Sequence, residues 1–342
     1  MTGEKPPRKT YLFRHFFRIC ILTKQEWRLM YARMLANAQQ FTQAIEQFQW
    51  LLPNYPDKAD ILYALGILSL QTEQLKTAKE YFKKLVHSEE RLNTAYYYLG
   101  QIAETEDNLA QALSWYQKVD DGSNYLNAQA RIALILVEQG QLDKALRHLH
   151  MVPVDNDEEA LILTQFEAEL LIEKQYYKRA MAVYNRALAD EPDNVELLYM
   201  RALLAEKMGA ITQLEQDLRR VLALEPDNVQ ALNALGYTLA DHTQRYQEAY
   251  ELIKQALSLR PNDYYILDSM GWVLYRMGHY AQAIKYLQKA LEQQFDPEVS
   301  AHLGEILWNS GDREAAEAIW NKALEAFPDN PKLLEVIQRF LP

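Results

Sequence analysis

The sequence contains little of what disulfide-bonded, zinc-binding or membrane-spanning proteins need. Cys20 is the only cysteine among 342 residues, so neither a disulfide within the chain nor a cysteine-based zinc site is available. No run of 18 apolar residues occurs, so no transmembrane helix is predicted. Glycine and proline are sparse, at 11 and 12 residues, whereas strong helix formers such as Ala, Leu, Gln, Glu and Lys are plentiful. These absences favour a helical protein and leave both the cytoplasm and the periplasm open.

Positive charge is scarce outside the first residues. The formal net charge is −11, yet residues 1–24 carry six Lys or Arg against Glu4 alone, about +5, which leaves about −16 for the remainder. Proteins that bind nucleic acid need clustered cations to contact the phosphate backbone. The acidic body of the chain therefore argues against a nucleic-acid partner.

The first 24 residues form a basic leader whose role the sequence leaves open. The segment Tyr11–Leu22 follows a basic start, as the apolar region of a signal peptide does. However, Arg14 and Arg18 interrupt it, no A-x-A-like cleavage site follows, and no small residue precedes Cys20 as a lipidation site requires. We therefore expect residues 1–24 to be an amphipathic or disordered leader, or a non-native start, rather than a working export signal.

A period of about 34 residues runs through most of the chain. When Gly236 is set as position 8 of a 34-residue repeat, every position 8 is small: Ala32, Gly66, Gly100, Ala133, Ala168, Ala202, Gly236, Gly271 and Gly304. With one-residue slips allowed, position 20 is alanine with one exception: Ala44, Ala78, Ala112, Ala145, Ala180, Leu214, Ala249, Ala283 and Ala316. Position 24 is always bulky and apolar: Phe48, Phe82, Tyr116, Leu149, Tyr184, Leu218, Ile253, Leu287 and Trp320.

This pattern resembles the tetratricopeptide repeat, over roughly residues 25–328. The resemblance implies an all-α protein, a right-handed α-solenoid of about nine helix-turn-helix repeats, each with a helix A and a helix B. Small residues at positions 8 and 20 let the two helices approach, and the residue at position 24 is expected to fill the space toward the next repeat. Proline ends helix B, and the Asp-Asn that follows supplies an N-cap for the next helix A. Residues 329–342 are expected to form a C-terminal capping helix.

Two stretches depart from the pattern. "ADHTQRYQEA" has one extra residue, which is expected to place His242 in an enlarged turn between helices. "RHLHMVPVDNDEEA" replaces the usual proline terminus with Pro153 and several acids, so a looser junction is expected there.

No catalytic motif is present. The chain lacks G-x-x-x-x-G-K-[ST], G-x-G-x-x-G, G-x-S-x-G and H-E-x-x-H. His148 and His150 are two residues apart and diverge on a helix, which is poor metal-binding geometry. Asp241 and His242 are better explained as turn residues than as a catalytic dyad. We therefore predict no enzyme activity, no catalytic residue, no metal, no cofactor and no small-molecule substrate.

The repeat resemblance also implies a binding face. In this family, positions 2, 5, 9, 12 and 13 of helix A tend to face the concave groove. Earlier repeats place Tyr63, Tyr97, Gln101 and Glu104 there. Exposed Tyr and Trp make effective interface anchors, although packing between repeats explains any single aromatic residue equally well. The predicted protein-binding residues are Tyr199, Asn233, Tyr237, Asp268, Trp272, Tyr275, Arg276, Glu305 and Trp308.

Two longer runs carry a more specific resemblance. Residues 233–291 and 302–324 are similar to the C-terminal part of proteobacterial tetratricopeptide-repeat outer-membrane lipoproteins. Such proteins are adaptors that bind a carboxyl-terminal processing protease in the periplasm and deliver cell-wall hydrolases to it. The resemblance implies a protein-binding adaptor in the periplasm or at the outer membrane, whereas the lack of a clear signal or lipidation motif favours the cytoplasm. A general assembly module of an envelope or cytoplasmic complex, or a subunit of an enzyme, remain the alternatives.

Overall fold

The structure, a computed structural model, describes residues 24–54 and 58–341. These residues form α-helices, one short 3-10 helix and no strand, which confirms the predicted all-α class. The predicted basic leader lies outside the described residues, except for Lys24, which begins the first helix. None of the helices described is long and apolar enough to cross a bilayer. The chain divides into two compact units, here the N-terminal unit (Met1–Leu163) and the C-terminal unit (Thr164–Pro342).

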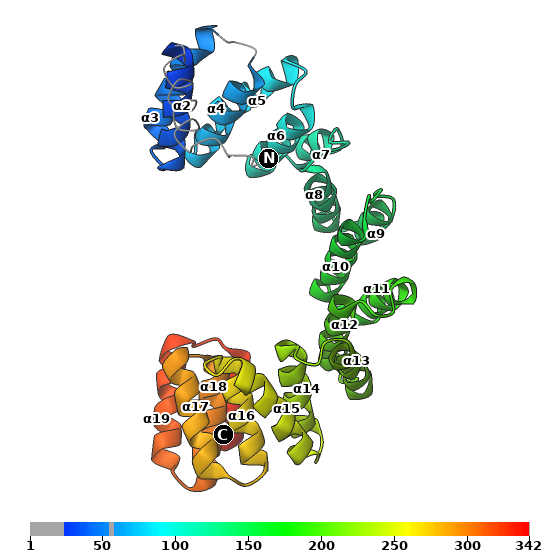
Figure 1. Cartoon of the computed structure of the whole chain (residues 1–342), viewed down its shortest axis with the longest axis vertical. Coiled ribbons are helices and arrows are strands. Elements are labelled where there is room, and N and C mark those ends of the chain that lie inside the picture. The colour runs from blue at the N-terminus through cyan, green and yellow to red at the C-terminus, as the bar shows by residue number, and fades with distance from the viewer. Residues whose placement is uncertain (1–23, 55–57, 342) are drawn as a thin grey trace, which may run out of the picture. The chain divides into compact units, whose positions relative to one another are not determined.

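The N-terminal unit consists of consecutive antiparallel helix pairs (Figure 1). Each helix A contacts the helix B that follows it, and the first three B helices each contact the next helix A. The described helices are α2 (Lys24–Asn37), α3 (Phe41–Leu51), η1 (Leu52–Asn54), α4 (Ala59–Gln71), α5 (Leu75–His87), α6 (Leu92–Thr105), α7 (Leu109–Tyr116), α8 (Tyr125–Glu138) and α9 (Leu142–His150). The division between the two units falls within α10 (Asp157–Glu173).

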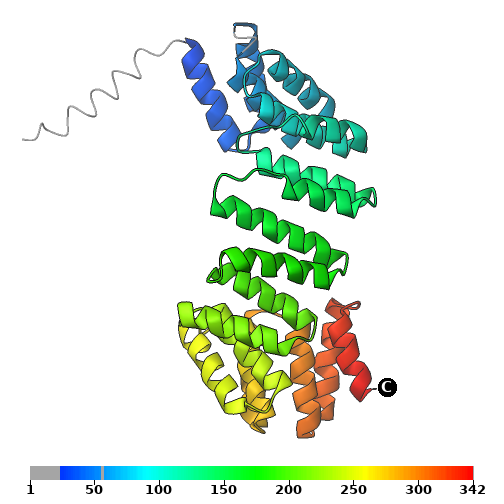
Figure 2. The same cartoon turned by 90° about the vertical axis from the view of Figure 1, so that its right-hand side faces the viewer.

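The C-terminal unit continues the same pairing and ends in a single helix (Figures 1 and 2). Here the A helices also contact one another, from α14 to α16, from α16 to α18 and from α18 to α20. The helices are α11 (Tyr177–Asp190), α12 (Val195–Lys207), α13 (Ile211–Leu224), α14 (Val229–His242), α15 (Tyr246–Leu259), α16 (Tyr264–Arg276), α17 (Tyr280–Gln293), α18 (Pro297–Ser310), α19 (Arg313–Ala326) and α20 (Pro331–Phe340). The last helix, α20, contacts α18 and α19 and thereby covers the end of the final pair.

The residues that defined the repeat lie where helices A and B touch. All the residues at positions 8, 20 and 24 are buried. A Cβ added to Gly66 would lie 2.6 Å from the Phe82 ring, and one added to Gly304 would lie 2.0 Å from the Trp320 ring. Position 24 therefore packs against helix A of its own repeat in addition to the space toward the next repeat that the sequence predicted.

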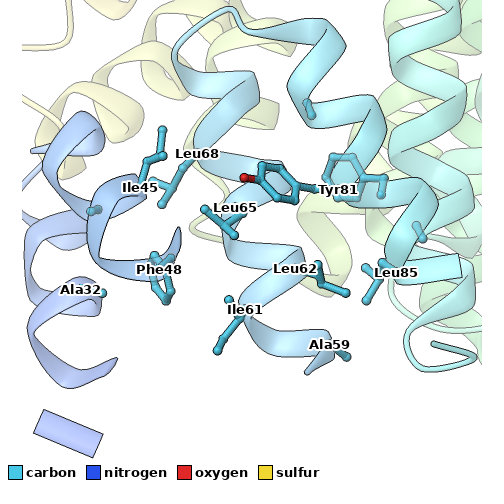
Figure 3. Packing of buried hydrophobic residues seen from close by; sticks show 14 of the residues in the cluster. Ala32, Ile45, Phe48, Ala59, Ile61, Leu62, Leu65, Leu68, Tyr81 and Leu85 are labelled. Atoms are coloured by element: carbon cyan, nitrogen blue, oxygen red, sulfur yellow. The ribbon is translucent and has the colours of Figure 1, made fainter. Parts of the chain in front are cut away.

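In the N-terminal unit, each cluster of buried apolar residues spans more than one helix pair. Figure 3 shows this in the N-terminal unit, where Phe48 of α3, Leu65 of α4 and Leu85 of α5 point into one cluster. The Phe82 ring also stacks on Tyr98 of the following helix A, with ring centroids 5.0 Å apart. A single helix pair leaves one apolar face uncovered, and its neighbour buries that face.

Polar side chains start the helices, as the Asp-Asn pattern predicted. The Oδ1 atoms of Asn194, Asn228 and Asn330 each accept a hydrogen bond from a backbone N–H three residues on, at 3.0 Å in every case. These bonds satisfy one of the backbone donors that a helix N-terminus leaves unpaired.

The two irregular stretches behave differently from each other. The extra residue in "ADHTQRYQEA" lengthens α14, so His242 is the last residue of that helix and the prediction that it sits in an enlarged turn was wrong. In "RHLHMVPVDNDEEA", α9 ends at His150 and α10 begins only at Asp157. The division between the two compact units falls in that next helix.

Candidate protein-binding groove

A groove of about 750 Å³ crosses the A helices of the C-terminal unit. Side chains from α12, α14, α16, α18 and α20 line it, together with Tyr280 at the start of α17. Successive A helices lie next to one another in a repeat array, so one face of each contributes to the same surface. Five of the nine predicted binding residues line this groove: Tyr237, Trp272, Tyr275, Arg276 and Glu305.

Trp272 lies deeper than an interface anchor usually does. Its side chain is buried, with 7% of the residue exposed, and its indole ring stacks on the imidazole of His302 at a centroid distance of 4.4 Å. The indole N–H donates to Asp241 Oδ1 at 3.2 Å. Trp272 therefore supports the base of the groove, while Tyr275 and Tyr280, which meet edge to face at 5.6 Å, are nearer the surface.

Arg276 is fully engaged within the protein. Its Nη1 donates to the backbone oxygen of Asp241 at 3.0 Å and to Asp241 Oδ1 at 3.3 Å. Its Nη2 donates to the Tyr246 hydroxyl at 3.3 Å. Asp241 thus accepts hydrogen bonds from both Trp272 and Arg276 one repeat later. The Asp241 carboxylate therefore holds two structural donors, and its Oδ2 also lies 3.5 Å from His242 Nε2.

Glu305 is also held by its neighbours. Arg339 Nη2 of α20 donates to Glu305 Oε2 at 3.2 Å, and the Tyr275 hydroxyl donates to Glu305 Oε1 at 3.4 Å. The Tyr275 hydroxyl in turn accepts a hydrogen bond from Asn309 Nδ2 at 2.8 Å. These contacts fix the groove surface where α16, α18 and α20 meet.

The sequence did not single out His302, which also lines the groove. Its Nδ1 lies 2.8 Å from Asp268 Oδ1, and this contact joins α16 to α18. His302 falls at position 6 of its repeat, outside the positions that the family pattern assigns to the groove. The spacing could have predicted this contact, because Asp268 and His302 are 34 residues apart and a separation of one repeat places them on adjacent A helices.

The pKa of His302 links the stability of this region to pH. Burial lowers the pKa, but the carboxylates of Asp268, Glu298 and Glu305 oppose it, and the pKa ends above the ordinary histidine value. The folded chain therefore binds the proton more tightly than the unfolded chain does. The resulting stabilisation is complete below about pH 6.5, the pKa of an unperturbed histidine, and is lost as pH rises through the folded pKa.

We expect the native chain to lose more stability than the His302→Gln variant between pH 6 and pH 9. Urea denaturation followed by circular dichroism at several pH values measures this difference. His279→Gln, which changes an exposed histidine outside the groove, serves as the control and should keep the native slope. Equal slopes for the native chain and His302→Gln would contradict the assignment.

Four predicted binding residues do not line the groove. Trp308 packs between Trp320 and Phe340, with both ring centroids at 5.9 Å, and so belongs to the contact between α18, α19 and the capping helix. Asp268 lies behind the groove as the partner of His302. Tyr199 is half-buried, and the Oδ1 of Asn233 is buried with no hydrogen-bond partner in the described part of the chain.

A separate, smaller groove of about 550 Å³ lies in the N-terminal unit. Tyr97, Gln101 and Glu104 line it, as the repeat positions predicted. Glu104 accepts hydrogen bonds from Arg131 Nε at 3.0 Å and from Nη2 at 2.5 Å, and also from the Tyr116 hydroxyl. This network occupies the carboxylate, so the smaller groove presents no unpaired charge from Glu104.

The C-terminal groove combines aromatic rings, hydrogen-bonding groups and carboxylates on successive helices. Across residues 24–54 and 58–341, no cluster of three His, Cys, Asp or Glu side chains could hold a metal ion.

Comparisons with known proteins agree on one family. A sequence profile described as "Tetratricopeptide repeat" matches residues 29–90, 70–126, 215–264 and 269–331. A TPR repeat-containing protein of Pseudomonas aeruginosa is 44% identical over 214 residues, covering 63% of this chain and 36% of the relative. Tetratricopeptide repeat protein 7A of Homo sapiens is 30% identical over 167 residues, covering 48% of this chain and 15% of the relative. The chain thus spans about a third or less of the length of these relatives.

Among solved structures, a tetratricopeptide repeat protein from Parabacteroides merdae is similar to this chain. It is 19% identical and has a TM-score of 0.49, with 82% of this chain and 97% of the other covered.

Proposed function

Because the chain belongs to the tetratricopeptide repeat family, whose arrays are protein–protein interaction scaffolds, we propose that its C-terminal groove holds one partner protein for delivery to another. Such arrays are typically non-catalytic, and they act by raising the effective concentration of one bound protein near the next. The observation that carries the proposal is the groove itself, in which aromatic and charged side chains from five successive A helices face one space.

The proposed partner is a carboxyl-terminal processing protease, and the proposed clients are cell-wall hydrolases. Support for this choice comes from residues 233–291 and 302–324, which resemble the adaptor lipoproteins that serve such a protease. Those two segments contain α15 and α16 and most of α14, α17, α18 and α19. Nine of the sixteen residues that line the groove lie in them, so the resembling residues and the groove overlap in part.

We expect the Tyr275→Ala/Tyr280→Ala variant to lose the partner while remaining folded. Both rings line the groove near its surface, and truncation of a tyrosine that acts as an interface hot spot costs about 2 kcal/mol or more, over tenfold in affinity. The measurement is an affinity pull-down from native cell extract with identification by mass spectrometry. If the double variant does not fold, Tyr280→Ala alone, which alters an exposed side chain, is tested in its place.

The matched control is Tyr264→Ala/Tyr265→Ala, a pair of tyrosines in contact on α16 outside the groove, with ring centroids 4.0 Å apart. Recovery of a processing protease with the native chain and the control, and its loss from the groove variant, would support the adaptor function. Recovery of assembly proteins without any protease would point to a general assembly module instead. Retention of every partner by a folded groove variant would remove the groove from the function.

A further inference from the structure

The cations of the C-terminal groove are each neutralised by a carboxylate of the same surface. Arg276 pairs with Asp241, Arg339 pairs with Glu305, and Lys332 pairs with Glu298. A partner carboxylate or phosphate would have to break one of these pairs to find a positive charge. The groove is therefore poorly suited to an anionic ligand.

Two carboxylates of the groove remain without an ion pair among the residues that the structure describes. Glu206 lies in the last turn of α12, and Glu335 lies on α20, so they stand on the first and last helices that line the groove. Both residues are exposed. Since the three ion pairs are balanced, these two side chains are the groove carboxylates that no Lys or Arg of the lining offsets.

Aromatic rings lie on the helices between these two carboxylates. Tyr237, Tyr275 and Tyr280 come from α14, α16 and the start of α17, and all three line the groove. Ring faces attract Lys and Arg side chains, and their apolar area also accommodates the alkyl stems of those residues. Aromatic and acidic groups in one concave surface thus favour a cationic ligand over a neutral one.

We propose that the groove binds a partner segment that carries two basic side chains, Lys or Arg, on either side of apolar or aromatic residues. One basic group meets Glu206 and the other meets Glu335, while the residues between them contact the tyrosines. The inference rests on the proposed binding function and adds the chemistry of the segment that is recognised. Charge complementarity with two unpaired carboxylates is its basis.

Selection from a random 12-residue peptide library displayed on phage, with the full chain as bait, tests the proposal. The expected result is enrichment of peptides with two Lys or Arg residues and an intervening aromatic or aliphatic residue. The same selection on the Glu206→Gln/Glu335→Gln variant should lose this basic excess. Enrichment of acidic or uncharged peptides, no enrichment at all, or the same basic peptides on the variant would each overturn the proposal.

Fluorescence anisotropy with the most enriched peptide then measures the contribution of each carboxylate. Glu206→Gln and Glu335→Gln should each weaken binding about threefold to fivefold, as expected for an exposed charge pair, and added salt should weaken it further. Glu317→Gln changes an exposed carboxylate on α19 outside the groove and should leave the affinity unchanged within about twofold. Equal effects at all three positions would show general charge attraction and overturn the proposal.

The experiments distinguish failure of the proposed binding function from failure of the proposed chemistry of the bound segment. Retention of the partner by Tyr275→Ala/Tyr280→Ala removes the binding function from the groove. Loss of the partner by that variant, together with selected peptides that lack basic residues, keeps the binding function and removes only the proposed chemistry of the segment.

Discussion

Gly304→Ala is expected to destabilise the end of the C-terminal unit by up to about 2 kcal/mol, although alanine is the better helix former. The added Cβ would lie 2.0 Å from Trp320 Nε1 and 2.3 Å from Trp320 Cε2, so the indole has to move. Trp320 is buried and stacks on Phe340 of the capping helix at 5.6 Å, which leaves it little space. The gain in helix propensity is about 1 kcal/mol, whereas overpacking of a core costs about 1–3 kcal/mol and occasionally more.

Native-state hydrogen exchange of the α18 and α19 amides measures this loss locally, because unfolding of a long repeat array need not be two-state. The double variant Gly304→Ala/Trp320→Leu copies the pair Ala202 and Leu218 at the same positions of an earlier repeat. We expect it to be more stable, by about 1–2 kcal/mol, than the sum of its two single variants predicts. Strict additivity would show that Gly304 and Trp320 do not constrain each other.

The sequence predicted the repeat register because that register is set by contacts within one helix pair. A small residue at position 8 and a bulky residue at position 24 lie in direct contact, as Gly66 and Phe82 do. This steric requirement restricts the size of the residues at positions 8 and 24 in every repeat. It acts within one helix pair and does not depend on neighbouring repeats. Positions 8, 20 and 24 could therefore be read from one sequence.

The C-terminal end of α14 could not be predicted from the sequence in the same way. One extra residue between two helices can lengthen either the turn or the helix. Asp241 stays helical while it accepts hydrogen bonds from Trp272 and Arg276 of the next repeat. These partners are 31 and 35 residues away, so the local sequence around His242 does not contain the deciding contacts.

For the groove, the pattern predicted the face on which residues lie but not their depth. Trp272 and Trp308 both fall at groove positions, yet Trp272 is buried under His302 and Trp308 packs against Trp320 and Phe340. The sequence predicted the capping helix only as a cover for the last repeat, so it gave no expectation for contacts of Trp308 or of the groove with that helix. The charge balance likewise depends on Lys332 and Arg339 of that helix.

Arg201→Met is expected to reduce the local stability of α12 and α13 by about 3–5 kcal/mol. Arg201 and Asp217 form a bidentate ion pair, with Nε to Oδ2 at 2.9 Å and Nη2 to Oδ1 at 2.6 Å. Only 3% of the Asp217 side chain and 17% of the Arg201 side chain are exposed. Removal of the guanidinium leaves a buried carboxylate that retains only the hydrogen bond from Gln213, and an uncompensated buried charge costs several kcal/mol.

The large loss expected for Arg201→Met follows from the burial of the ion pair and not from the short distance between its atoms. An exposed ion pair of the same length serves as the control. Arg220 and Asp193 have the same closest distance of 2.6 Å, but their side chains are 49% and 54% exposed, so Arg220→Met should cost less than about 1 kcal/mol. Arg201→Met/Asp217→Leu should recover most of the stability, because no unpaired charge remains buried. Hydrogen exchange of the α12 and α13 amides compares the three variants. Equal losses from Arg201→Met and Arg220→Met would show that water reaches Asp217, and that this ion pair contributes no more than an exposed one.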